Sequence, residues 1–130
     1  MPDLNIWAVL VSAIAAFVAG AGYYGVLGEK LADVSEAAAA GEDMPPWKVA
    51  VELLRCLLLA TVVAGLATVG GIDEWAGGLT LGLALWIGFP AVLWAGAMLH
   101  ERTPWQLAAI HAGDWLVKLL LIGLIVSVWQ

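Results

Sequence analysis

The residues best suited to chemistry in this sequence are ionisable side chains placed inside otherwise apolar segments. They are Glu52, Arg55, His111, Asp114 and Lys118. A charged side chain at the centre of a membrane-spanning helix costs about 2.5–3.5 kcal/mol on insertion scales. Such residues pair with one another or serve an ion, a proton or a polar solute. These five residues are therefore the candidate site.

Their spacing places each group on one face of a helix. At about 100° per residue, His111, Asp114 and Lys118 fall within an arc of roughly 60°. Asp114 precedes Lys118 by four residues, which is the favourable order for an ion pair within a helix. Glu52 and Arg55 share a face of an earlier apolar segment in the same way.

The two groups are also expected at similar depth. Glu52 and Arg55 lie roughly 7–12 Å below the start of their segment, and His111 and Asp114 lie roughly 10–15 Å below the start of theirs. The formal charges of Glu52, Arg55, Asp114 and Lys118 sum to zero. We predict a closed network in which Arg55 pairs with Asp114, and Glu52 lies near Lys118 or His111.

Two functions fit such a network. The favoured interpretation is a structural or assembly role, in which the charges fix the register of the helices. The alternative is a transporter or channel for protons or a small polar solute, since His111 could change its charge near neutral pH. No Ser-His-Asp set, thiol pair or phosphate-binding loop supports an enzyme. His111 and Asp114 make only two metal ligands beside two cations, so a metal site is not expected. No other cofactor is expected, and haem or quinone binding by His111 is the weak alternative.

The elements that position these residues are apolar helices. Of 130 residues, 63% are hydrophobic and 12% are charged, against about 45–50% and 25% in soluble domains. Lipid excludes open sheet edges, so the predicted fold is all-α, a single transmembrane domain of four helices. The four segments cover about residues 4–27, 47–69, 75–99 and 104–129 of the domain 1–130.

Two further features concern helix shape and packing. Pro90 lies inside the third segment and predicts a kink, because proline cannot donate the helical hydrogen bond. Ala8, Ser12, Ala16 and Gly20 recur every four residues in the first segment. Such a ridge of small side chains lets helices approach closely. The ridge fits either a neighbouring helix of the same chain or a second copy in a homodimer.

Basic residues predict the orientation. Lys30, Lys48 and Arg102 lie in or beside the first and third loops, whereas the termini and the second loop have no Lys or Arg. The positive-inside rule then places the loop of about residues 28–46 and the third loop in the cytoplasm, with both termini outside. The expected surroundings are the lipid bilayer. A nucleic-acid partner is not expected, since the sequence has no basic stripe.

The whole chain resembles the uncharacterised bacterial membrane family catalogued as domain of unknown function 1761. The matching stretches are LNIWAVLVSAIAAFVAGAGYYGVLGEKL, GLTLGLALWIGFPAVLW and HERTPWQLAAIHAGDWLVKLLLIGLIVSVW. The resemblance implies a four-helix integral protein of the bacterial cell membrane and implies no activity. The family pattern Asn-Ala-Gly-Tyr-His in the last helix reads His-Ala-Gly-Asp-Trp at 111–115 here, which argues against one fixed mechanism requiring Asp114.

Overall fold

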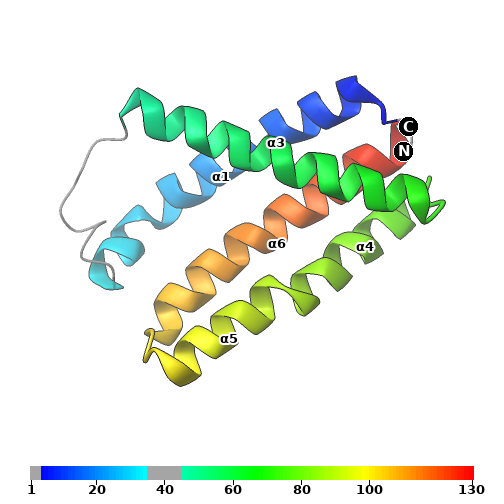
Figure 1. Cartoon of the computed structure of the whole chain (residues 1–130). Coiled ribbons are helices and arrows are strands. Elements are labelled where there is room, and N and C mark those ends of the chain that lie inside the picture. The colour runs from blue at the N-terminus through cyan, green and yellow to red at the C-terminus, as the bar shows by residue number, and fades with distance from the viewer. Residues whose placement is uncertain (1–3, 35–44) are drawn as a thin grey trace.

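The computed structural model describes residues 4–34 and 45–130, and these residues form helices joined by short connections (Figure 1). The helices are α1 (Ile6–Val34), α3 (Pro46–Val69), α4 (Trp75–Gly88), α5 (Pro90–His100) and α6 (Trp105–Val128). They contain four stretches long and apolar enough to cross a membrane: Ile6–Gly28, Pro46–Val69, Trp75–His100 and Trp105–Val128. The prediction of an all-α fold with four membrane-spanning helices is confirmed.

Helix α6 is the central element of the bundle. Helices α1, α3, α4 and α5 all pack against it. The start of α1 and the end of α6 lie together with the α3–α4 turn at one end of the molecule (Figure 1). The α5–α6 turn lies at the other end with the start of α3. Side chains on α6 can therefore reach every other helix.

The helix ends follow from local chemistry. The Asn5 side-chain oxygen accepts hydrogen bonds from the backbone N–H groups of Trp7 and Ala8, at 3.1 and 3.2 Å, and so caps α1. Pro46 occupies the first turn of α3, where its missing N–H costs nothing. Gly71 adopts a φ of +67° in the α3–α4 turn, a conformation that glycine reaches without steric cost.

The third span is broken at Phe89, between α4 and α5. Phe89 has φ −123° and ψ −75°, outside the helical region. Its N–H still donates to the carbonyl of Leu85 at 3.0 Å, but Pro90 has no N–H to continue the series. The kink expected near Pro90 is confirmed.

Helices α4 and α6 pack with their backbones in direct contact. A Cβ built on Gly78 would overlap the carbonyl oxygen of Gly123, and one built on Gly82 would lie 2.6 Å from the carbonyl oxygen of Leu119. Gly78 and Gly82 are four residues apart, the spacing of small residues that permits such contact in membranes. This interface therefore depends on the absence of side chains.

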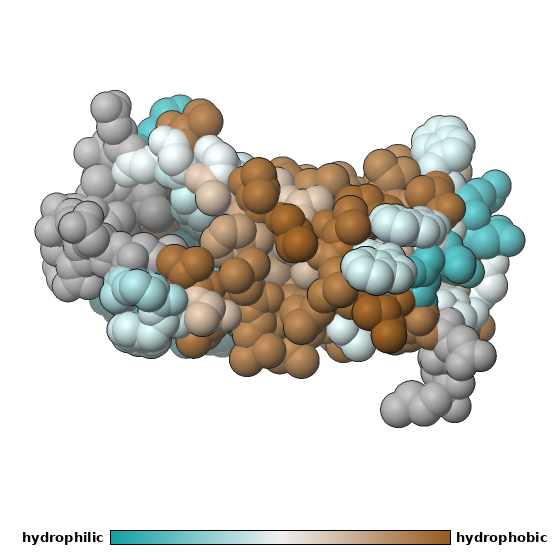
Figure 2. Space-filling view, turned by 90° about the horizontal axis from the view of Figure 1, so that it is seen from above, coloured by the Kyte–Doolittle hydropathy of each residue, from teal (hydrophilic) through white to brown (hydrophobic). Residues whose placement is uncertain are grey.

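The surface is apolar around its middle. Large hydrophobic side chains such as Leu58, Val62, Ile87 and Val92 are exposed. On the face seen in Figure 2, apolar residues cover the central part, and more polar residues gather toward both ends. This distribution fits contact between the middle of the bundle and lipid tails.

Candidate functional site

Helix α6 positions the two most deeply buried charges. Asp114 and Lys118 lie one helical turn apart, and the Lys118 Nζ is 2.9 Å from the Asp114 Oδ2. A lysine side chain on a helix points back toward the N-terminal turn, which brings the ammonium of Lys118 to the carboxylate of Asp114.

Helix α3 supplies the other two charges. The Lys118 Nζ also donates to the Glu52 Oε1 at 3.2 Å, and the Arg55 Nη1 donates to the Glu52 Oε2 at 2.6 Å. The four residues form a continuous chain of ion pairs, which we call the charge network: Arg55, Glu52, Lys118 and Asp114. Its members carry two positive and two negative formal charges.

Exposure falls steadily along the charge network. The side chain of Arg55 is 58% exposed and that of Glu52 is 25% exposed, against 9% for Lys118 and 5% for Asp114. The charge network thus leads from the bundle surface at Arg55 to the interior at Asp114.

The predicted Arg55–Asp114 pair is wrong. Arg55 instead pairs within its own helix with Glu52, three residues earlier. Lys118 occupies the place between the two carboxylates, because its ammonium reaches Asp114 on α6 and Glu52 on α3 together. The expected proximity of Glu52 to Lys118 is present.

Helix α1 adds no charged side chain to the charge network, but its Gly20 leaves room for Lys118 and Asp114. A Cβ built on Gly20 would lie 2.9 Å from the Lys118 Cε and 3.3 Å from the Asp114 Oδ1. The remaining members of the small-residue series on α1 are buried inside this single chain as well: Ala8, Ser12 and Ala16. The series therefore faces the interior of the bundle.

His111 lies in a separate aromatic cluster. Its Nδ1 is 2.6 Å from the Tyr24 Oη, and its ring stacks on that of Trp94 with 5.0 Å between centroids and 13° between planes. The neighbouring Tyr23 hydroxyl donates to the Ile110 carbonyl at 2.6 Å. Of the five predicted site residues, the structure therefore brings together Glu52, Arg55, Asp114 and Lys118. His111 is hydrogen-bonded to a tyrosine instead.

Little room remains beside the charge network. The cavity next to it measures about 20 Å³, and its walls are Glu52, Arg55, Cys56, Leu59, Trp115 and Lys118. A space of that size holds about one water molecule. The Asp114 Oδ1 is buried and has no hydrogen-bond partner among the described residues. Within residues 4–34 and 45–130, no three His, Cys, Asp or Glu residues gather as a metal site would require.

Comparison with known families identifies the family of this chain. The family model described as "Protein of unknown function (DUF1761)" matches residues 7–127. The chain belongs to this family. The match confirms the resemblance read from the sequence, and it includes every residue of the charge network. Searches of curated proteins and of solved structures find no match.

Several residues that shape this DUF1761 chain were not singled out from the sequence. Gly78 and Gly82 were missed, although their spacing of four inside an apolar segment was the available signal. Tyr24 and Trp94 were missed as partners of His111. The signal for Tyr24 was a hydroxyl inside an apolar helix, which needs a hydrogen-bond partner when buried.

Proposed function

We propose that this chain is a structural or assembly protein of the membrane, in which the charge network fixes the register of α3 and α6. The observation that carries the proposal is the position of Lys118. Its buried ammonium lies between carboxylates from two different helices, at 2.9 Å from Asp114 and 3.2 Å from Glu52. A shift of one helix along the other by a single turn, about 5.4 Å, would separate Lys118 from Glu52.

The surroundings of the charge network support this role over transport. Each charged group already has a partner of opposite sign. A transported solute would have to displace one of these partners, and the adjoining cavity of about 20 Å³ is too small to admit it. Charges that are already paired, beside so small a space, suit a fixed contact between helices.

The test compares the unchanged protein with Asp114→Asn, in liposomes and in detergent. A structural role predicts a lower melting temperature in detergent and an unchanged proton flux in liposomes. Asp73→Asn, in the exposed α3–α4 turn, is the matched control and should change neither. The proposal would be overturned by two results together. The unchanged protein would give a proton flux above that of empty liposomes, and Asp114→Asn would abolish this flux while the fold stays intact.

A transporter or channel for protons or a small polar solute is the second candidate. It is favoured by one observation, the buried Asp114 Oδ1 that lacks a hydrogen-bond partner among the described residues. In this candidate Asp114 would take up the proton or solute, with His111 one turn nearer the α5–α6 turn. The flux arm of the same experiment distinguishes the two candidates.

We further propose that the chain lies in the bacterial cell membrane with both termini outside. The start of α3, which holds Lys48, and the α5–α6 turn, which holds Arg102, lie at the same end of the bundle (Figure 1). Basic residues mark the cytoplasmic side. Part of the first loop, residues 35–44, lies outside the described residues. A homodimer would use exposed faces of the helices, since the small-residue series of α1 is buried within one chain.

A further inference from the structure

We propose that this chain binds a membrane phospholipid with an anionic headgroup, whose phosphate contacts Arg55 and whose acyl chain lies in an apolar groove at the Pro90 kink. This inference does not depend on the structural role proposed above. It rests on the groove, on its continuity with the charge network, and on the sign of the exposed charge at its mouth.

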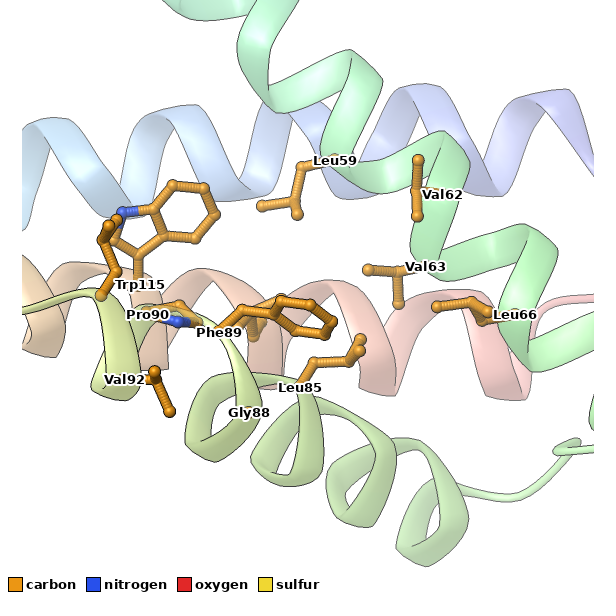
Figure 3. Close-up of a pocket in the computed structure, with 12 residues that line it drawn as sticks. Leu59, Val62, Val63, Leu66, Leu85, Gly88, Phe89, Pro90, Val92 and Trp115 are labelled. Atoms are coloured by element: carbon orange, nitrogen blue, oxygen red, sulfur yellow. The ribbon is translucent and has the colours of Figure 1, made fainter.

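The groove is a hollow of about 620 Å³ between α3 and the kinked third span. Leu59, Val62 and Leu66 face Leu85 and Phe89 across it, with Trp115 of α6 at one end (Figure 3). Every residue that lines it is apolar, and its volume lies within the range of about 300–1,000 Å³ typical of ligand sites. An acyl chain is an occupant that needs no polar contact.

The groove continues into the charge network. Leu59 and Trp115 line both the groove and the small cavity beside Arg55 and Lys118. Arg55 also shares a face of α3 with the groove residues, because the steps from Arg55 to Leu59, Val62 and Leu66 keep within an arc of about 60°. A single amphiphilic molecule can therefore contact the guanidinium and the groove together.

The exposed charge of the network is positive. The Arg55 side chain is 58% exposed, against 25% for Glu52 and 5% for Asp114. Glu52 accepts a hydrogen bond from the Arg55 Nη1, whereas a guanidinium carries five N–H donors. The remaining donors suit a phosphate, which arginine binds through two parallel hydrogen bonds.

The order of these features along α3 matches the order of parts in a phospholipid. Arg55 reaches back to Glu52, toward the end of α3 where Trp47 marks the membrane interface. The groove residues of α3 extend from Leu59 to Leu66, and Leu66 lies about 10 Å deeper along the helix axis than Leu59. A headgroup near the interface would thus lie above a chain that runs toward the bilayer centre.

The test measures lipid binding to the purified protein by native mass spectrometry in detergent. Phosphatidylglycerol and phosphatidylcholine with the same acyl chains are titrated in parallel. We expect phosphatidylglycerol to bind about fivefold more tightly, the effect of one basic residue on an anionic lipid. Arg55→Gln should remove this preference and Arg55→Lys should retain most of it. Arg102→Gln, which removes a charge from the exposed α5–α6 turn, should leave the preference unchanged.

A second pair of variants tests the groove. An added Cβ on either Gly88 or Gly96 meets no heavy atom of the described residues within 4 Å, but only Gly88 lines the groove. Gly88→Leu should therefore weaken binding of both lipids, while Gly96→Leu should not. Equal affinity of the unchanged protein for the two lipids, or full binding by Gly88→Leu, would overturn the proposal. Spectra in which the protein forms a dimer without bound lipid would overturn it as well.

Discussion

Lys118 determines the arrangement of charge at the scale of single residues. Its ammonium is shared by one carboxylate of its own helix and one of α3, and Gly20 of α1 leaves the space in which it lies. A cation in this position offsets the charge of the deeply buried Asp114 and shares Glu52 with Arg55. In an apolar bundle, an unpaired buried charge is costly.

We expect Lys118→Met to be strongly destabilising. Methionine fills a similar volume but leaves Asp114 and Glu52 without their shared cation, and breaking a buried ion pair costs about 3–5 kcal/mol. Thermal unfolding in detergent measures the effect. Lys30→Met, which alters an exposed lysine of α1, should change stability by less than about 0.5 kcal/mol. Equal losses in the two variants would show that Lys118 has no special role.

The helix elements differ in how they achieve contact. Helix α4 meets α6 through glycines that let the two backbones touch. Helix α5, after the break at Phe89, turns its Trp94 onto His111. Helix α3 diverges from the kinked span and leaves the apolar groove between them. The break at Phe89 thus lies where the third span borders the groove.

We expect Gly82→Ala to destabilise the bundle by about 1–3 kcal/mol, because the added methyl group would lie against the α6 backbone at Leu119. Gly96→Ala is the matched control, since its methyl group has open space and alanine favours helix over glycine. Melting temperatures in detergent distinguish them. A Gly82→Ala protein as stable as Gly96→Ala would mean that α4 and α6 do not pack this closely.

At the scale of the molecule, the sequence predicts the spans and not their contacts. The kink follows from Pro90 alone, because a proline inside a helix removes a hydrogen bond and its ring clashes with the preceding turn. The Arg55–Asp114 pair was wrong because matched depth and opposite sign do not decide which cation meets which acid. That choice depends on the relative rotation of α3 and α6. The stacking of His111 on Trp94 depends in turn on the direction of α5 after the break. Local patterns do not encode these rotations.

The orientation of the whole molecule can be tested by cysteine labelling in intact cells. Cys56 is buried, so the unchanged protein is the blank. Asp73→Cys lies in the α3–α4 turn and Glu101→Cys near the α5–α6 turn, and both positions are exposed. We expect a membrane-impermeant maleimide to label Asp73→Cys and to leave Glu101→Cys unlabelled until the cells are opened. The reverse pattern would contradict the proposed orientation.

The claim that the charge network joins α3 to α6 is tested most directly by a double-mutant cycle on Glu52 and Lys118. The free energy of unfolding in detergent is measured for the unchanged protein, Glu52→Gln, Lys118→Gln and the double variant. We predict a coupling energy of about 0.5–3 kcal/mol, the range for residues in one ion-pair network. Effects that add within about 0.3 kcal/mol, as they do for independent sites, would contradict the account.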